Sequence, residues 1–430
     1  APRRSTSPPR AAPPPPPAVD ARAIALAARR QAILFRQHVP PTPDRRHLSF
    51  FGGAPVAPRG FAWPEAAGPS GASAPVSFLM QVDCAAIPAD GRLGVLPDRG
   101  VLYVFMDGGA NAFRVLYEPG PADDWTEVAP PATLGVLYPS SLPPDSGWAP
   151  IDAPRLWPRW TFDPVLVRGG PLPDDPEALA ESYAWPGTVD VRAAVEAIPG
   201  AVAPYRGFAD LLRGEGGRLL RPFDAYPHDW NAVRLGAAHA ARRLAREAGT
   251  RLRPTRDTTE AESAALAETL RAECREWQAR AAAAAPFDAV PPEERDRFWA
   301  WIQERAWFTR YVLQEAVTDA VEASLLAGGE AAARVPADAV DRIRHRHALG
   351  VATERGVQVN APHRMLAAPV DAQAMGDVEE RARDQLLLLE ISNDEGLGHQ
   401  LGEGVVQLWI RPADLAARRF DRVELSASAY

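Results

Sequence analysis

The sequence predicts an α+β fold: an antiparallel β-sheet core with a candidate internal two-fold repeat, interrupted by a helical insertion. Short apolar runs bounded by turn-forming residues occur in two places, near residues 76–117 and in residues 386–430, and such runs predict buried strands. Between them, from about residue 190 to 350, the apolar residues recur at helical spacing instead. We therefore expect one sheet domain whose two parts are separated by helices.

Length and composition indicate a large globular protein. A chain of 430 residues exceeds the size at which one core usually stops growing. The 46% hydrophobic content and twelve tryptophans predict a packed interior, whereas 45 prolines and 32 glycines predict many loops and short strands. The formal net charge of −8 argues against a phosphate-backbone binder, so we expect no nucleic-acid partner.

The cysteines and the apolar stretches indicate the compartment. Cys84 and Cys274 are too few and too far apart for a disulfide scaffold or a zinc knuckle, which favours a reducing environment. No uninterrupted apolar stretch has the length of a signal peptide or a membrane span, so we expect a cytoplasmic protein without a membrane partner. The common phosphate, dinucleotide, hydrolase and zinc-protease motifs are absent, and we predict no cofactor and no metal site.

The chain divides into four expected segments. They are a disordered proline-rich tail (1–18), an N-terminal helix with the first β half (19–189), a helical insertion (190–356) and the second β half (357–430). Five consecutive prolines favour an extended spacer in the tail, with an SH3-type ligand as the alternative. Apolar residues at helical spacing predict an amphipathic helix from Val19 to about Gln37, which Pro40 and Pro41 end.

The first β half begins with an irregular loop over 48–66. Its glycines, Gly52 and Gly53, permit unusual backbone angles, and Trp63 offers a large apolar anchor. Strands are predicted for Val76–Val82, Val101–Met106, Phe113–Tyr117 and Thr161–Val167, the last one after a proline-rich stretch.

Helix signals dominate the insertion. Capping residues and helical periodicity predict helices over 190–198, 229–247, 258–284, 291–326 and 337–348. The long fourth helix has an apolar face made of Phe298, Trp301, Ile302, Phe308, Tyr311 and Val312. The aromatic cluster over 298–308 is expected to lie in a bundle core, as aromatic residues at helical spacing usually do, and a ligand groove is the alternative.

The last 45 residues predict a compact set of strands. Leu386–Ile391 is a continuous apolar run that Ser392, Asn393 and Asp394 stop, and Val405–Ile410 is a second run that ends before Pro412. One or two helical turns over 414–419 and a third strand over 420–425 follow.

The two β regions resemble each other. SFLMQVD at 77–83 is similar to LLLLEIS at 386–392, and GVLYVF at 100–105 is similar to GVVQLWI at 404–410, with glycine-containing connections of similar length. A true repeat and a chance similarity of two apolar hairpins both explain this pattern.

The same stretches carry a family resemblance. GGAPVAPRGFAWP, SFLMQVD, LPDRGVLYVF, FRVLYEPG, PHRMLAAPVDAQ, LLLLEISNDEGLG and VQLWIRPADLAARRFDRV occur in an order that resembles the YwqG-like family, catalogued as domain of unknown function 1963. The resemblance covers about 45–120 and 360–430, and it implies an α+β fold with internal repetition and no established activity. The family usually has Gln and Asp where this chain has Glu390 and Ser392, and Gly-Tyr where it has Ala367 and Ala368.

Polar residues near the predicted sheet form the candidate binding site. If the two halves face each other, side chains from both could meet at a shared cleft with hydrogen-bond donors and acceptors on rigid strands. The candidate binding residues are Trp63, Gln81, Asp83, His363, Asp371, Gln373, Asp394, His399 and Trp409. The alternative is that the glutamines only satisfy buried backbone groups.

Two further clusters lie in the insertion. Asp224, Tyr226, His228 and Asp229 place carboxylates beside an imidazole, but no nucleophile or orienting group follows by spacing, and helix capping accounts for Asp229. The basic run over 342–347 fits either a solvated helix face or an acidic partner.

These observations leave three hypotheses for the function. The leading one is a non-enzymatic module that binds an unknown protein or small molecule, with an immunity-type role beside bacterial toxins as one version by family analogy. The second is a hydrolase or transferase that uses the Asp and His groups at the cleft. The third is a structural subunit that assembles through the helical insertion.

Overall fold

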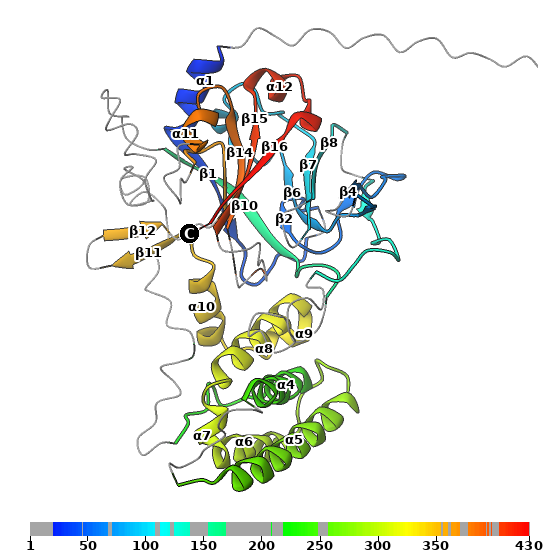
Figure 1. Ribbon diagram of the computed structural model, residues 1–430, viewed down its shortest axis with the longest axis vertical. Coiled ribbons are helices and arrows are strands. Elements are labelled where there is room, and N and C mark those ends of the chain that lie inside the picture. Colours follow the sequence, from blue (N-terminus) through cyan, green and yellow to red (C-terminus); the bar gives the residue numbers. More distant parts are fainter. Residues whose placement is uncertain are drawn as a thin grey trace, which may run out of the picture.

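The computed structural model describes residues 20–44, 46–67, 71–107, 112–120, 124–137, 154–168, 208, 218–247, 257–353, 356–359, 363–369, 377–392, 394, 397 and 404–429. The predicted tail and the helix predicted over 190–198 lie outside these residues. One part of the protein is a ten-stranded antiparallel sheet, and helices α4 to α9 form a lobe at one end of it (Figure 1). The predicted α+β class with a helical insertion is therefore confirmed.

Two long strands occupy the centre of the sheet. β1 (Gln31–Gln37) pairs with β10 (Trp160–Arg168) over seven residue pairs, from Gln31 opposite Arg168 to Gln37 opposite Phe162. The other neighbour of β1 is β13 (His363–Met365), and the other neighbour of β10 is β2 (Phe50–Phe51). β1 thus lies between β10 of the first half and β13 of the second half, which joins the two ends of the chain in one sheet.

The outer strands complete both halves. On one side lie β6 (Phe78–Asp83), β7 (Val101–Met106) and β8 (Phe113–Glu118); on the other lie β14 (Leu386–Ser392), β15 (Gly404–Ile410) and β16 (Glu424–Ala429). The strand order β16-β15-β14-β13-β1-β10-β2-β6-β7-β8 is symmetrical about the junction of β1 and β10. The predicted hairpins 76–106 and 386–410 are both present, because each apolar run is buried on the sheet.

Strand register establishes the internal repeat. Gln81 lies opposite Tyr103 in the first half, and Glu390 lies opposite Gln407 in the second. A register shift occurs between Phe78 and Met80 in one half and between Leu387 and Leu389 in the other, which are equivalent positions of the aligned sequences. A β-bulge at the same place is a defined feature that chance hairpins do not share, so the two halves repeat one structure.

The predicted helix from Val19 to Gln37 is wrong over its second part. Helix α1 (Ala21–Ala28) is capped by Asp20, whose side chain accepts a hydrogen bond from the Ala23 N–H. The helix ends at Ala28. The chain then becomes β1, because its apolar run Ile33–Phe35 is buried between two neighbouring strands. Long-range pairing with β10 overrides the local helical pattern.

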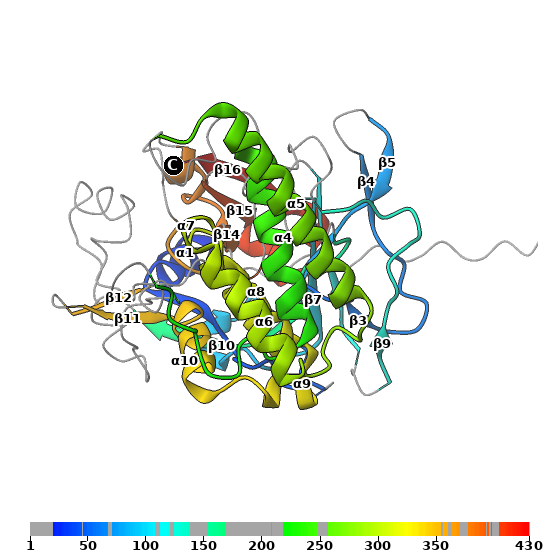
Figure 2. The ribbon, with the colours of Figure 1, turned by 90° about the horizontal axis from the view of Figure 1, so that it is seen from below.

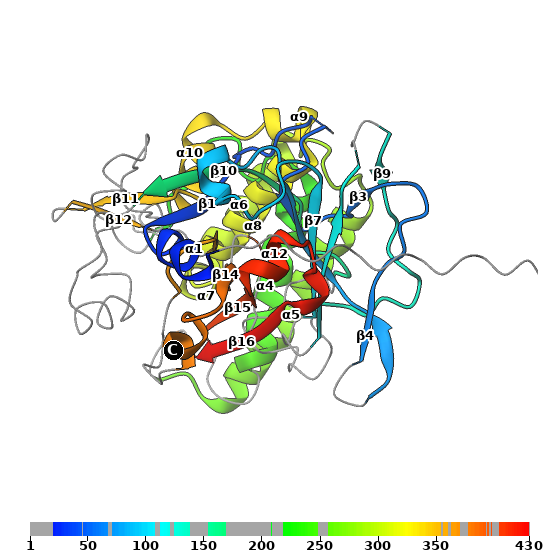
Figure 3. The ribbon, with the colours of Figure 1, turned by 90° about the horizontal axis from the view of Figure 1, so that it is seen from above.

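Short strands, turns and helices surround the sheet. The small pairs are β3 (Val56–Ala57) with β9 (Thr126–Glu127), β4 (Glu65–Ala67) with β5 (Ser73–Pro75), and β11 (Gly350–Thr353) with β12 (Gly356–Val359). The helical pieces are η1 (Ala89–Arg92), α11 (Asp377–Arg381), α12 (Pro412–Ala416) and η4 (Phe420–Arg422). Residues 420–422 were predicted as part of a strand but form the 3-10 helix η4, and the strand starts at Glu424. Helices α1 and α12 pack together at the end of the sheet opposite the helical lobe (Figure 3).

The helical lobe packs around α4. Its helices are α4 (Trp230–Glu247), α5 (Glu260–Ala282), α6 (Pro292–Glu304), α7 (Ala306–Thr309), α8 (Leu313–Ala327) and α9 (Gly329–Ala333), and α10 (Ala337–Arg346) leads back to the sheet. Helix α4 packs against α5 and α8, and Figure 2 shows α4 and α5 side by side beneath the sheet. A capping box at Thr259 and Glu262 starts α5, close to the start of the helix predicted over 258–284.

The single long helix predicted over 291–326 is wrong. It is divided into α6, α7 and α8 by two breaks, the first at Arg305 and the second at 310–312. The Arg305 side chain binds the Glu273 carboxylate on α5, with Nη2 2.6 Å from Oε1, and the Thr309 hydroxyl donates to the Ile302 carbonyl at 2.8 Å. The Thr309 hydroxyl occupies the Ile302 carbonyl, which in a continuous helix would accept from the N–H four residues later. Of the predicted apolar face, Tyr311 is exposed and the other five residues are buried.

A continuous core joins the lobe to the sheet. Buried residues of both parts belong to one cluster, and the His347 ring lies 4.8 Å from the Trp160 ring of β10. Arg346 pairs with the nearly buried Glu322 of α8 at 3.0 Å. Cys84 and Cys274 are both free and buried, and burial raises the pKa of each thiol to about 12.

Candidate functional site

The predicted sheet site brings His363 and Asp394 together. His363 Nε2 lies 3.2 Å from Asp394 Oδ2, and the Ser392 N–H donates to His363 Nδ1 at 3.4 Å. The His363 ring also packs 4.9 Å from the Phe51 ring, and His363 is only 2% exposed. This pair lies in the interior of the sheet domain, whereas the enzymatic hypothesis requires the pair to face an open pocket.

Gln81 satisfies backbone groups. Its Oε1 accepts from the Val56 N–H at 2.8 Å, its Nε2 donates to the Leu48 carbonyl at 3.0 Å, and the residue is fully buried. Asp83 lies at the end of β6, where its carboxylate accepts from the Ala85 N–H at 2.9 Å. Gln81 therefore satisfies buried backbone groups, as the alternative interpretation stated for the glutamines, and Asp83 bonds to the backbone two residues further along the chain.

The two candidate tryptophans are anchors of the sheet. Trp63 donates from Nε1 to the Val76 carbonyl at 2.8 Å and packs edge-on against Phe105. Trp409 is fully buried and donates from Nε1 to Ser426 Oγ at 2.8 Å. Asp371, Gln373 and His399 lie outside the described residues, so their roles stay predictions.

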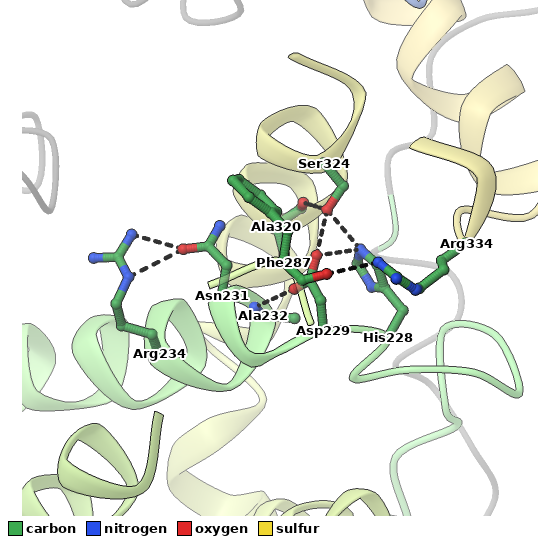
Figure 4. Close-up of polar contacts among 9 residues, drawn as sticks. All are labelled: His228, Asp229, Asn231, Ala232, Arg234, Phe287, Ala320, Ser324 and Arg334. Atoms are coloured by element: carbon green, nitrogen blue, oxygen red, sulfur yellow. Dashed lines mark hydrogen bonds and ion pairs between the residues drawn. The ribbon is translucent and has the colours of Figure 1, made fainter. Parts of the chain in front are cut away.

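A second polar cluster joins α4 to α8 (Figure 4). Ser324 Oγ donates to Asp229 Oδ2 at 2.7 Å, and His228 Nε2 lies 2.9 Å from the same Oγ. Asp229 also accepts from the Ala232 N–H at 2.8 Å, which caps α4 as its sequence predicts. All three of these polar side chains are buried.

This cluster has the residue types of a catalytic triad but a different arrangement. The Asp229 carboxylate and the Ala320 carbonyl, 3.0 Å from Ser324 Oγ, only accept, so the hydroxyl proton serves them. His228 Nε2 then donates to Ser324 Oγ, and in this arrangement it does not act as a base toward that hydroxyl. Burial lowers the pKa of His228, against the opposing effect of Asp229. A neutral imidazole in a buried network fits a structural joint between two helices.

An exposed tyrosine with two neighbouring arginines lies at the second helix break of the lobe. Tyr311, predicted to lie on the apolar face of one long helix, is 57% exposed at the break over 310–312. The guanidinium carbons of Arg243 and Arg310 lie 4.1 Å and 4.6 Å from the centre of its ring. We call Arg243, Arg310 and Tyr311 the arginine–tyrosine surface.

Hydrogen bonds hold this surface in place. Arg310 Nη2 donates to the Tyr311 hydroxyl at 2.6 Å, and Arg243 Nη1 donates to the Phe308 carbonyl at 3.1 Å. The phenol, as an acceptor from Arg310, keeps its own proton for a further acceptor. Two guanidinium groups and one phenol donor thus favour an acidic group.

The family comparison agrees with the repeat. A family model described as "Domain of unknown function (DUF1963)" matches residues 49–186 and 247–427, which is well over half of the chain. The chain belongs to this family. No curated protein matches it, and among the described residues of this DUF1963 protein no helix is long and apolar enough to cross a membrane.

The basic run of this DUF1963 protein is not one solvated face. Arg344 pairs with Asp341 on the outside of α10, whereas Arg346 and His347 turn inward to Glu322 and Trp160. Tyr311 shows the opposite error, since helical spacing placed it on the apolar face of one long helix. In the sequence, the guanidinium group of Arg310 and the hydroxyl group of Tyr311 are the features that indicate an exposed position.

Proposed function

We propose that this DUF1963 protein is a non-enzymatic binding module and that it holds an acidic segment of a partner protein on the arginine–tyrosine surface. The observation that supports this proposal is the exposure of Tyr311 between two guanidinium groups. Tyrosine and arginine are the residue types that most often dominate binding energy at protein interfaces. An immunity-type role beside bacterial toxins is one version of this proposal, and it depends on family analogy alone.

Charge supports an acidic partner at this surface despite the net charge of −8. Two carboxylates of α8 contact a histidine of α4, because Asp319 Oδ2 lies 2.7 Å from His239 Nε2 and Glu315 Oε2 lies 3.6 Å from His239 Nδ1. A carboxylate of the partner would meet Arg310 and the Tyr311 hydroxyl together, which gives charge-assisted hydrogen bonds.

The test uses the full chain as bait in extracts of its native cells, followed by mass spectrometry and purification of the captured protein. Y311A and R310E should each weaken binding of that purified partner by about 30-fold or more, the scale of an interface hot spot. R297E is the matched control, because Arg297 is an exposed arginine of the same lobe, paired with Glu294 on α6.

Light scattering on the same variants separates the other hypotheses. A self-association that Y311A abolishes would show that the occupant is a second copy and would overturn the partner proposal. Equal loss of the partner in R297E, or full binding in both Y311A and R310E, would also overturn it.

A further inference from the structure

Three potential metal ligands meet where the two central strands join the first half of the sheet. One ligand atom from each of His38, His47 and Asp163 lies within 4.8 Å of the other two. The rings of His38 and His47 are 5.0 Å apart, and His38 Nε2 lies 3.0 Å from Asp163 Oδ2. All three side chains are half-buried, with 25% of the His38 side chain exposed, so a bound ion would keep contact with solvent.

Rigid elements supply these ligands. Asp163 lies on β10, and His38 follows β1 directly, where its N–H donates to the Thr161 carbonyl at 2.8 Å. His47 comes from the segment that returns to β2, after a turn in which its N–H donates to the Asp44 carbonyl. Two sheet strands and a hydrogen-bonded turn therefore hold the three side chains in place.

The remaining ring nitrogens have the partners that metal-bound histidines require. His47 Nε2 lies 2.8 Å from the Phe162 carbonyl. A carbonyl only accepts, so Nε2 carries the proton and Nδ1 presents a lone pair. His38 Nδ1 lies 3.0 Å from Thr161 Oγ1, which can accept its proton and leave Nε2 for the ion. Such outer partners fix the tautomer and orientation of histidine ligands.

We propose that His38, His47 and Asp163 form a binding site for one divalent transition-metal ion of the zinc class. Two imidazoles and one carboxylate suit zinc, iron(II) or cobalt(II), whereas calcium and magnesium prefer oxygen ligands alone. Bonds of about 2.1 Å place neighbouring ligand atoms of a tetrahedral ion about 3.4 Å apart, so small rotations of the half-exposed side chains close the site. Three protein ligands leave one position for water or another ligand.

Arg36 is the competing cation. Its Nη2 lies 3.0 Å from Asp163 Oδ2, and 51% of its side chain is exposed, so it can swing into solvent when an ion binds. The guanidinium beside it favours the ionised carboxylate, which is the form that a metal ligand must have.

The experiment is titration of the untagged, chelator-treated full chain with zinc chloride, followed by calorimetry. We expect one ion per chain and an affinity that falls about 100-fold or more in H47A and in D163N. R36Q should bind zinc about fivefold more tightly, because it removes one positive charge a few ångströms from the ion. H345A is the matched control, since His345 is a half-exposed histidine on α10.

D163N keeps the shape of the side chain, so it remains decisive if H47A fails to fold by circular dichroism. Unchanged zinc affinity in D163N, an equal loss in H345A, or several weak ions per chain would each overturn the proposal. Y311A and R310E should leave zinc binding unchanged, because their site is on the helical lobe; the two proposals therefore fail or succeed separately.

Discussion

The two halves of the sheet share the same backbone arrangement but differ in the side chains that stabilise it. At equivalent positions, Ser49 Oγ accepts from the Asp83 N–H at 3.1 Å in the first half, and His363 Nδ1 accepts from the Ser392 N–H at 3.4 Å in the second. The strand register and the bulge agree as well. The backbone pattern therefore persists where the side chains do not.

The difference is largest at Gln81 and its counterpart Glu390. Gln81 is neutral and bonds to two backbone groups. Glu390 is 3% exposed, accepts from Arg364 Nε at 2.7 Å and from Gln407 Nε2 at 2.9 Å, and begins a chain that continues through Ser426 to Trp409. At this position the first half is thus stabilised by hydrogen bonds to the backbone, whereas the second half is stabilised by a buried ion pair and a network of side chains.

This difference explains how the repeat tolerates divergence. A side chain that bonds only to its neighbouring backbone can change alone if the backbone finds another partner. A buried ion pair cannot change alone, since the remaining charge would be left without its partner. We therefore expect single substitutions to destabilise the second half more than the first, except at positions where the first half requires an unusual backbone conformation.

The largest effect should come from that exception, Gly52. Its φ of +59° is left-handed, and a Cβ there would lie 2.1 Å from the Pro158 carbonyl oxygen. Its counterpart Leu366 has φ +42° but a buried side chain, so the second half accepts a Cβ at this position. G52A should lose more than about 4 kcal/mol of unfolding free energy, with little folded protein recovered.

L366A is the matched variant for this comparison. It removes only packing and should still fold, with a loss of about 2–5 kcal/mol. Circular dichroism and urea unfolding measure both variants. A G52A protein with the melting temperature of the unsubstituted chain would show that the backbone pattern of the first half is not fixed.

Glu390 should give the next largest effect. E390A leaves the Arg364 guanidinium and the Gln407 amide without their buried partner, so we expect a loss of about 3–5 kcal/mol. Q81A leaves two backbone groups to find other partners, and we expect about 1–3 kcal/mol. Urea unfolding of both variants measures the difference, and a larger loss in Q81A would reverse the proposed contrast.

Sequence reasoning found the parts of this structure that local patterns encode. The strands around Met80, Val104 and Leu389 were predictable, because each apolar run is flanked by turn-forming residues and is buried where it stands. β1 was missed, since its apolar run continues a helical pattern and its partner β10 lies over a hundred residues away. β2 and β13, of two and three residues, are too short to leave a periodic signal.

The candidate sites depended even more on long-range geometry. His38 and Asp163 are 125 positions apart, and only the pairing of β1 with β10 brings them together. Tyr311 fits a core pattern until the helix breaks at Arg305 and at 310–312. Helix breaks that depend on tertiary contacts, such as the bond of Arg305 to Glu273, are not encoded in local periodicity.

The smallest expected effect is the pH dependence of the unfolding free energy. It has opposite directions in the two halves, because the pKa of Glu424 is lowered and that of Tyr103 is raised. In the second half, hydrogen bonds from Gln385 and Arg381 lower the pKa of Glu424. A lowered folded-state pKa stabilises the protein above the unfolded value of 4.5 and loses that contribution as the pH falls through the folded value. In the first half, burial raises the pKa of Tyr103, so its contribution is present below pH 10 and is lost as the pH rises beyond it.

Acid should therefore weaken the second half and alkali the first. E424Q removes the acid-sensitive group, so its unfolding free energy should fall less steeply than that of the unsubstituted chain between about pH 5 and pH 3. Y103F should leave that acid limb unchanged and flatten the decline above about pH 10. Glu424 is half-exposed, and solvent screening keeps its effect small. Urea unfolding across this pH range measures both limbs. If the unfolding free energy of E424Q and of the unsubstituted chain fell equally with acid, Glu424 would make no contribution to stability, and the ionic stabilisation of the second half would come from the Arg364–Glu390 pair.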